Sequence, residues 1–142
     1  MAGGEANECT PVVERSIAHI GATVMGRHMF GGHPGPWDAA APCNGWWSAD
    51  PTFHFVTYGI ASALAQARQA AGGLDVALGG GANVAQQFLA AGLVDEMDIN
   101  LVPILLGHGE RLFEGLADTL HGLELVRSVA APGVAHLEFA KR

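Results

Sequence analysis

Two short apolar runs, ATVMG at residues 22–26 and DVALGG at residues 75–80, end in glycine, and each precedes a stretch with helical character. A strand, a helix and a second strand joined in this order form a right-handed crossover, which places the two strands parallel in one sheet. The loops after such strands lie at the carboxyl ends, where open α/β sheets bind ligands. The pattern therefore predicts an α/β fold with both glycine-containing loops on one rim.

Periodicity and turn residues predict the other elements. We expect a helix over 10–20 ended by Gly21, a strand over 53–57, a helix over 59–71 ended by Gly72 and Gly73, a helix over 83–91, a long strand over 95–107, and a closing antiparallel hairpin that turns at 131–133.

Length and charge limit the class of protein. A chain of 142 residues predicts a single domain, 1–142, and its net charge of -7 argues against nucleic acid or an anionic membrane as partner. No apolar run approaches the roughly 20 residues that span a bilayer, and residues 1–10 lack the pattern of a signal peptide, so we expect a cytoplasmic protein. Two cysteines, Cys9 and Cys43, give no disulfide framework.

The three consecutive glycines at 79–81 allow two interpretations. They can form a tight turn between strand and helix, or they can let the backbone approach a phosphate at a helix N-terminus. The second glycine-containing loop, MGRH at residues 25–28, is expected on the same rim and favours the phosphate site. On this interpretation, Gly80→Val should weaken ligand binding more than it weakens the fold.

Histidines and tryptophans supply the other candidates. His28, His33, Cys43 and His54 lack the spacing of metal ligands, so no metal site is expected. His108 is a candidate proton donor or a solvated loop residue, and Asp38 is a candidate acid. Trp37, Trp46 and Trp47 lie in a loop rich in glycine and proline, where they could bind substrate, form an interface or cover the core.

Three segments together resemble a known family. ATVMGRHMF, DVALGGGANVAQQFLAAGLVDEMDINLVPILLGHGERLF and LELVRSVAAPGVAHLEF are similar to the dihydrofolate-reductase-like family, in the branch of small bacterial reductases akin to the reductase domain of riboflavin biosynthesis. The resemblance implies a three-layer α/β sandwich with a mostly parallel sheet and a C-terminal antiparallel hairpin. It also implies NADPH as the cofactor.

The resemblance assigns cofactor contacts to both glycine-containing loops. It places Gly26, Arg27, His28 and Met29 at the cofactor phosphates, and Gly79, Gly80, Gly81, Ala82, Asn83 and Val84 around the pyrophosphate beside the nicotinamide. A guanidinium directly after a strand suits bidentate phosphate contact, and a helix N-terminus adds the positive end of its dipole.

The chain departs from the family at two places, which implies a shortened sheet. Residues 1–9 do not read as the family's first, central strand, and WWSADPTFHFVT runs through without the family's PVFVLT-like strand. Three arrangements could satisfy the backbone groups exposed by this loss: direct pairing of DVALGG with MDINLVPIL, a strand from a partner chain, or a rearranged sheet. We expect a homo-oligomer, such as a homodimer formed by strand pairing or exchange.

Three functions follow from these observations. The first is an NADPH-dependent reductase of a small heterocyclic or carbonyl substrate, in which the protein positions the cofactor and supplies a proton. The second is a repurposed enzyme on the same scaffold that works without a cofactor, catalysing a cyclisation or an isomerisation. The third is a non-catalytic, dimeric binding module.

Overall fold

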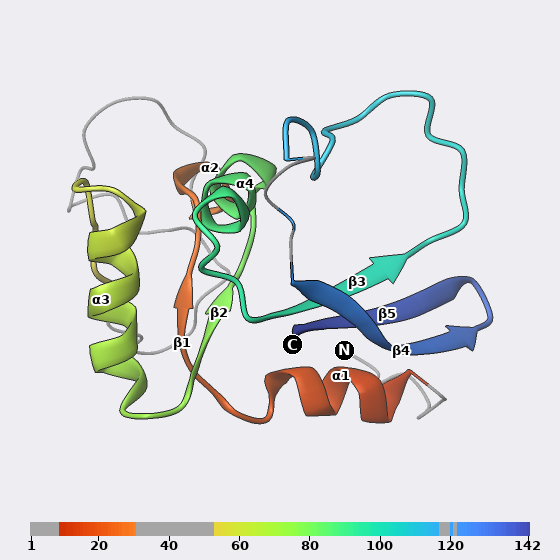
Figure 1. The fold of residues 1–142 in the computed structure, drawn as a ribbon, viewed down its shortest axis with the longest axis horizontal. Helices are drawn as coiled ribbons and strands as arrows, with labels where there is room; N and C mark the ends of the chain where they lie inside the picture. Colours follow the sequence, from red (N-terminus) through yellow and green to blue (C-terminus); the bar gives the residue numbers. More distant parts are fainter. Residues whose placement is uncertain (1–8, 31–52, 117–119, 121) are drawn as a thin grey trace. The chain divides into compact units, whose positions relative to one another are not determined.

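A computed structural model describes residues 9–30, 53–116, 120 and 122–142. The fold is mixed α/β, and the chain divides into two compact units, one formed by residues 21–85 and the other by residues 1–20 with 86–142. Each unit has its own small sheet (Figure 1). Among the described helices, none has the length and apolar character needed to cross a membrane.

The unit of residues 21–85 is built on two parallel strands, β1 (Ile20–Val24) and β2 (Asp75–Leu78), which pair with each other (Figure 1). The short helix α2 (Arg27–Phe30) follows β1, and α3 (Ile60–Ala71) packs against β2. Gly72 ends α3 in the left-handed conformation, with φ +61°, as predicted from the Gly-Gly pair.

Gly21 serves close packing, contrary to the prediction that it ends the first helix. That helix, α1 (Thr10–Ile17), ends three residues before β1 begins at Ile20. A Cβ atom on Gly21 would lie 2.6 Å from the Ala71 carbonyl oxygen and 2.8 Å from the Leu74 Cβ. Because real Cβ contacts are not this short, the glycine lets β1 approach the end of α3.

The other unit is an antiparallel sheet whose strands follow the order β3-β5-β4. These strands are β3 (Glu96–Leu101), β4 (Leu123–Ala131) and β5 (Val134–Lys141), and α4 (Ala82–Ala90) leads into them. The β4–β5 hairpin turns at Pro132 and Gly133, where Gly133 has φ +83°, so the predicted hairpin is confirmed. Val12, Phe88, Leu89 and Leu116 are the buried apolar side chains described in this unit.

Two predicted strands differ from the structure. Residues 53–57 lie outside the described strands, and Phe53 and Phe55 are exposed. An apolar alternating run becomes a strand only where a neighbouring strand completes the ladder.

The long strand expected over 95–107 is also shorter, because β3 ends at Leu101. Leu101 pairs with Ala135, so Val102 would come opposite Val134, the first residue of β5, directly beside the hairpin turn. The following Pro103 has no N–H to donate to a ladder.

The shortened sequence raises the question of how the backbone groups next to the missing strands are satisfied. β2 and β3 belong to separate sheets in separate units, and the direct pairing considered for DVALGG and MDINLVPIL stays a prediction. Residues 1–8, on which the prediction about the first strand rests, lie outside the described residues.

Candidate functional site

The two glycine-containing loops meet at the carboxyl ends of the parallel strands. The Gly79 N–H donates to the Val24 carbonyl oxygen at 2.8 Å, and the Gly26 N–H donates to the Gly80 carbonyl oxygen at 2.9 Å. These two bonds extend the β1–β2 pairing beyond both strands and join the loops into one surface, which we call the glycine rim (residues 25–29 and 79–84). The rim forms where parallel α/β sheets bind ligands.

Three glycines of the rim have structural reasons to be glycine. A Cβ on Gly26 would lie 2.9 Å from Val84 Cγ2, and one on Gly79 would lie 3.0 Å from Thr23 Cγ2. Gly80 has φ +106°, a conformation that strains any L side chain, and its missing Cβ faces Met29. Valine at Gly80 should therefore cost stability whatever the rim binds, so this variant cannot separate binding from folding.

Gly81 is different, because a Cβ built there meets no atom within 4 Å and its φ is not positive. Packing and backbone strain therefore do not require glycine at this position. The open space lies at the start of α4, whose first helical bond runs from the Ala85 N–H to the Gly81 carbonyl oxygen at 3.1 Å. The amides of residues 82–84 precede that bond, at the positive end of the helix dipole.

The structure brings together most of the predicted cofactor residues. Gly26, Met29, the three glycines at 79–81, Ala82 and Val84 all belong to the rim, and Arg27 begins α2 there with an exposed side chain. Asn83 lies on the first turn of α4, and its side chain is also exposed. The backbone of His28 belongs to α2, but its side chain lies outside the described part of the structure.

Of the predicted acids and tryptophans, the structure describes His108 alone. His108 is exposed in the chain after β3, in the other unit, and the described residues include no hydrogen-bond partner for it. Asp38, Trp37, Trp46 and Trp47 lie outside the described residues. Their roles stay predictions.

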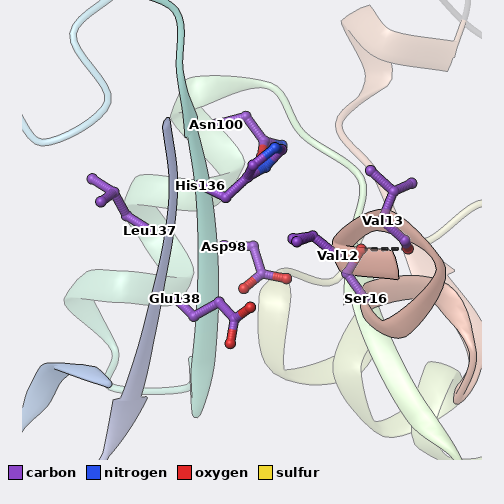
Figure 2. A pocket seen from close by; sticks show the side chains of 8 residues that line it. All are labelled: Val12, Val13, Ser16, Asp98, Asn100, His136, Leu137 and Glu138. Carbon is purple, nitrogen blue, oxygen red and sulfur yellow. Dashed lines mark hydrogen bonds between the residues drawn. The ribbon is translucent and has the colours of Figure 1, made fainter. Parts of the chain in front are cut away.

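A second group of polar side chains lies between α1 and the β3–β5 pair, and the sequence analysis missed it. Figure 2 shows Asp98 and Asn100 of β3, with His136 and Glu138 of β5, on the side of the sheet that Val12 of α1 covers. We call this space the α1 hollow. The sequence does contain a pattern that indicates this group. DIN at residues 98–100 and HLE at residues 136–138 each place two polar residues on one face of a strand and an apolar residue on the other.

His136 is the buried member of this group, with only 5% of its surface exposed. Its Nδ1 lies 2.6 Å from Asn100 Oδ1, and because an amide oxygen only accepts, Nδ1 carries the proton and donates. In the neutral ring Nε2 is then an acceptor, and it has no hydrogen-bond partner among the described residues. The ring is oriented for accepting a proton or a hydrogen bond.

The carboxylates beside His136 differ in their partners. Glu138 Oε1 accepts from Arg127 Nη1 at 2.8 Å, and Arg15 Nη1 lies 3.8 Å away. No arginine or lysine among the described residues pairs with Asp98. Its pKa is raised above the usual range, first by burial and then by repulsion from Glu138, while His136 acts in the opposite direction. Within the described residues, no cluster of three histidine, cysteine or acidic side chains is arranged to hold a metal ion.

Comparison with known proteins assigns the chain to a family and a fold. The family model described as the RibD C-terminal domain matches residues 47–137. A crystal structure from Shewanella sp. PV-4, described as a "Putative riboflavin biosynthesis protein", is similar over 100% of this chain and 84% of that chain, with a TM-score of 0.62 and 20% sequence identity. A likeness at this identity shows the fold alone. No curated protein matches the chain.

Proposed function

The chain belongs to the family of the RibD C-terminal domain, whose fold is dihydrofolate-reductase-like, and from this premise we propose that it is an NADPH-dependent reductase of a small heterocyclic or carbonyl substrate. The observation that carries the proposal is the glycine rim, in which the Gly26 N–H donates to the Gly80 carbonyl oxygen and joins two loops at the carboxyl ends of β1 and β2.

The rim has the features that a dinucleotide phosphate needs. Gly81 leaves open space where a side chain would stand, so a phosphate oxygen can approach the backbone. The amides at the start of α4 can donate to that oxygen, and the helix dipole favours the negative charge. The exposed Arg27 guanidinium, on the neighbouring loop, can donate two parallel hydrogen bonds to a phosphate.

The residues of this chain bind and orient the cofactor. NADPH, when bound, supplies the hydride, and the protein holds the phosphates at the rim so that the nicotinamide lies in a fixed place. Met29 lies beside Gly80 and provides an apolar surface next to the backbone that the phosphates would approach. The proton that completes a reduction comes from an acid of the chain or from water. His108 and Asp38 are the proposed acids.

Calorimetric titration with NADPH tests the proposal, and Gly81 offers the sharpest variant. We expect Gly81→Ala to weaken NADPH binding about tenfold, because the added Cβ occupies the approach to the backbone. The same change should lower the free energy of unfolding by less than about 1 kcal/mol, since alanine at this helix start only replaces a better capping residue. Gly81→Val should weaken binding further.

Arg27→Ala provides an independent test, with Arg68→Ala as its matched control. Arg68 is an exposed arginine of the same unit, in the last turn of α3, away from the rim. We expect the first variant to weaken NADPH binding about tenfold and the second to leave it unchanged. If the wild-type protein does not bind NADPH at millimolar concentration, the cofactor-independent enzyme becomes the better hypothesis.

A further inference from the structure

His136 carries a buried acceptor that the described residues leave without a partner. Its Nδ1 donates to Asn100 Oδ1, so Nε2 presents a lone pair, and only 5% of the residue is exposed. Nε2 lies on the side of the imidazole ring away from Cβ, so it points off the sheet and into the α1 hollow (Figure 2). A buried acceptor without a hydrogen bond costs free energy, which a donor bound in the hollow would recover.

The register of β3 and β5 places two carboxylates directly opposite each other beside this ring. Asp98 pairs with Glu138, and the next pair on the same face joins Asn100 to His136. Like charges directly opposite each other in a ladder are destabilising. Repulsion from Glu138 is accordingly the second reason, after burial, why the pKa of Asp98 is raised.

The neighbouring arginines compensate one of these two carboxylates. Glu138 Oε1 accepts from Arg127 Nη1 of β4 at 2.8 Å, and Arg15 Nη1 of α1 lies 3.8 Å from the same oxygen. Among the described residues, no arginine or lysine pairs with Asp98. The hollow therefore keeps one uncompensated negative charge and one buried lone pair, and a single cationic donor would satisfy both.

The rest of the lining also suits a small donor. Ser16 Oγ donates to the Val13 carbonyl oxygen at 2.9 Å, so its lone pairs remain free to accept a hydrogen bond. The cavity measures about 20 Å³, and one water-sized group needs about 10–15 Å³. Val12 and Val13 form an apolar wall, against which an attached alkyl chain can pack. The hollow therefore has room for one polar head group.

We propose that the α1 hollow binds a primary alkylammonium ion, whose N–H groups donate to His136 Nε2 and to the Asp98 carboxylate. The ammonium group of such an ion carries one positive charge, three donors and no acceptor, which matches the lining. A metal ion fits less well, since the described residues include no cluster of three histidine, cysteine or acidic side chains arranged to hold one. A water molecule would satisfy Nε2 but would leave the charge of Asp98 uncompensated.

Titration of the full chain with methylammonium chloride, in phosphate buffer without any amine, tests the proposal. We expect saturable binding by calorimetry, with a dissociation constant of about 1–10 mM for one ion held by a few charge-assisted hydrogen bonds. The ¹⁵N resonance of His136 Nε2 should shift over the same concentration range. Tetramethylammonium chloride is the control ligand, because it has the same charge and no N–H, and it should leave this resonance unchanged.

Matched variants identify the groups that bind the ion. Asp98→Asn removes the charge and keeps the shape of the side chain, so it should weaken methylammonium binding at least about tenfold. His136→Phe keeps a ring without the lone pair and should have a similar effect. Glu124→Gln is the control, because Glu124 is an exposed acid of β4 that does not line the hollow, and it should bind like the wild type. Far-UV circular dichroism checks that each variant is folded.

Nα-acetyl-lysine amide, titrated alongside, separates the two sources of such a group. Binding as tight as that of methylammonium identifies the lysine side chain of a partner, and weaker binding identifies a free amine. Both acceptors are lost when they bind a proton, so the affinity for either probe should fall as the pH falls.

Three results would overturn the proposal. They are the absence of saturable methylammonium binding up to about 100 mM, an equal shift of the His136 resonance with tetramethylammonium, and a folded Asp98→Asn variant that binds as tightly as the wild type. The Asp98→Asn result decides the question even if His136→Phe does not fold. None of these readouts involves NADPH, so they stand apart from the test of the reductase.

Discussion

Glycines in one short run have different physical reasons to be there. Gly79 is needed because Thr23 is close, and Gly80 because its φ is +106°, whereas no contact or strain explains Gly81. Packing accounts for glycine at the first position and backbone conformation for glycine at the second, whatever the rim binds. Gly81 is the residue on which the phosphate interpretation depends, and it can be changed without disturbing its neighbours.

Asp98 gives a prediction about pH. Its folded-state pKa is raised, chiefly by burial and then by Glu138, so the folded protein holds the proton more tightly than the unfolded chain does. The protonated Asp98 carboxyl contributes to the free energy of unfolding. This contribution is fully present when the pH is below the unfolded-state pKa, near 3.8, and it is lost as the pH rises through the higher folded-state pKa.

We therefore expect Asp98→Asn to be more stable than the wild type at pH 7 and equally stable near pH 3, since asparagine resembles the protonated carboxyl. The gain should be below about 1 kcal/mol, because the side chain is only partly buried and solvent screens its charge. Urea unfolding at both pH values measures it. A variant that is less stable than the wild type at pH 7 would show that the carboxylate has a favourable partner in solution.

At the scale of elements, the structure depends on how closely β1 approaches α3. We expect Gly21→Ala to lower the free energy of unfolding by about 1–3 kcal/mol, because the new Cβ would lie 2.6 Å from the Ala71 carbonyl oxygen and the strand or the helix must shift. Chemical denaturation measures the loss. Gly81→Ala is the matched control, since it adds the same methyl group where nothing lies within 4 Å. Equal losses in the two variants would contradict this account of Gly21.

For the whole molecule, association should be visible in thermal stability. A ligand or partner that binds only the folded state raises the melting temperature, so the Tm of a dimer increases with protein concentration. We expect this increase for the wild type, because the shortened sheet predicts a homo-oligomer. Differential scanning fluorimetry over a dilution series measures it. A wild-type Tm that does not change with concentration would count against a folded dimer.

The sequence by itself determined the elements whose signals are local. Helix α3 ends at the predicted Gly72, the hairpin turns at Pro132 and Gly133, and both glycine-containing loops follow strands, because helix ends and turns depend on the φ preferences of a few neighbouring residues. The family resemblance also rested on such local segments, and the match over residues 47–137 confirmed it.

Only the tertiary structure decided the features that depend on distant residues. β3 ends at Leu101, whose partner Ala135 lies beside the β4–β5 turn, and residues 53–57 lie outside the described strands although their apolar residues alternate. His136 is buried because α1, more than a hundred residues earlier, covers its face of the sheet. Local periodicity cannot report these outcomes, since a strand's length and a side chain's burial are set by what lies against them.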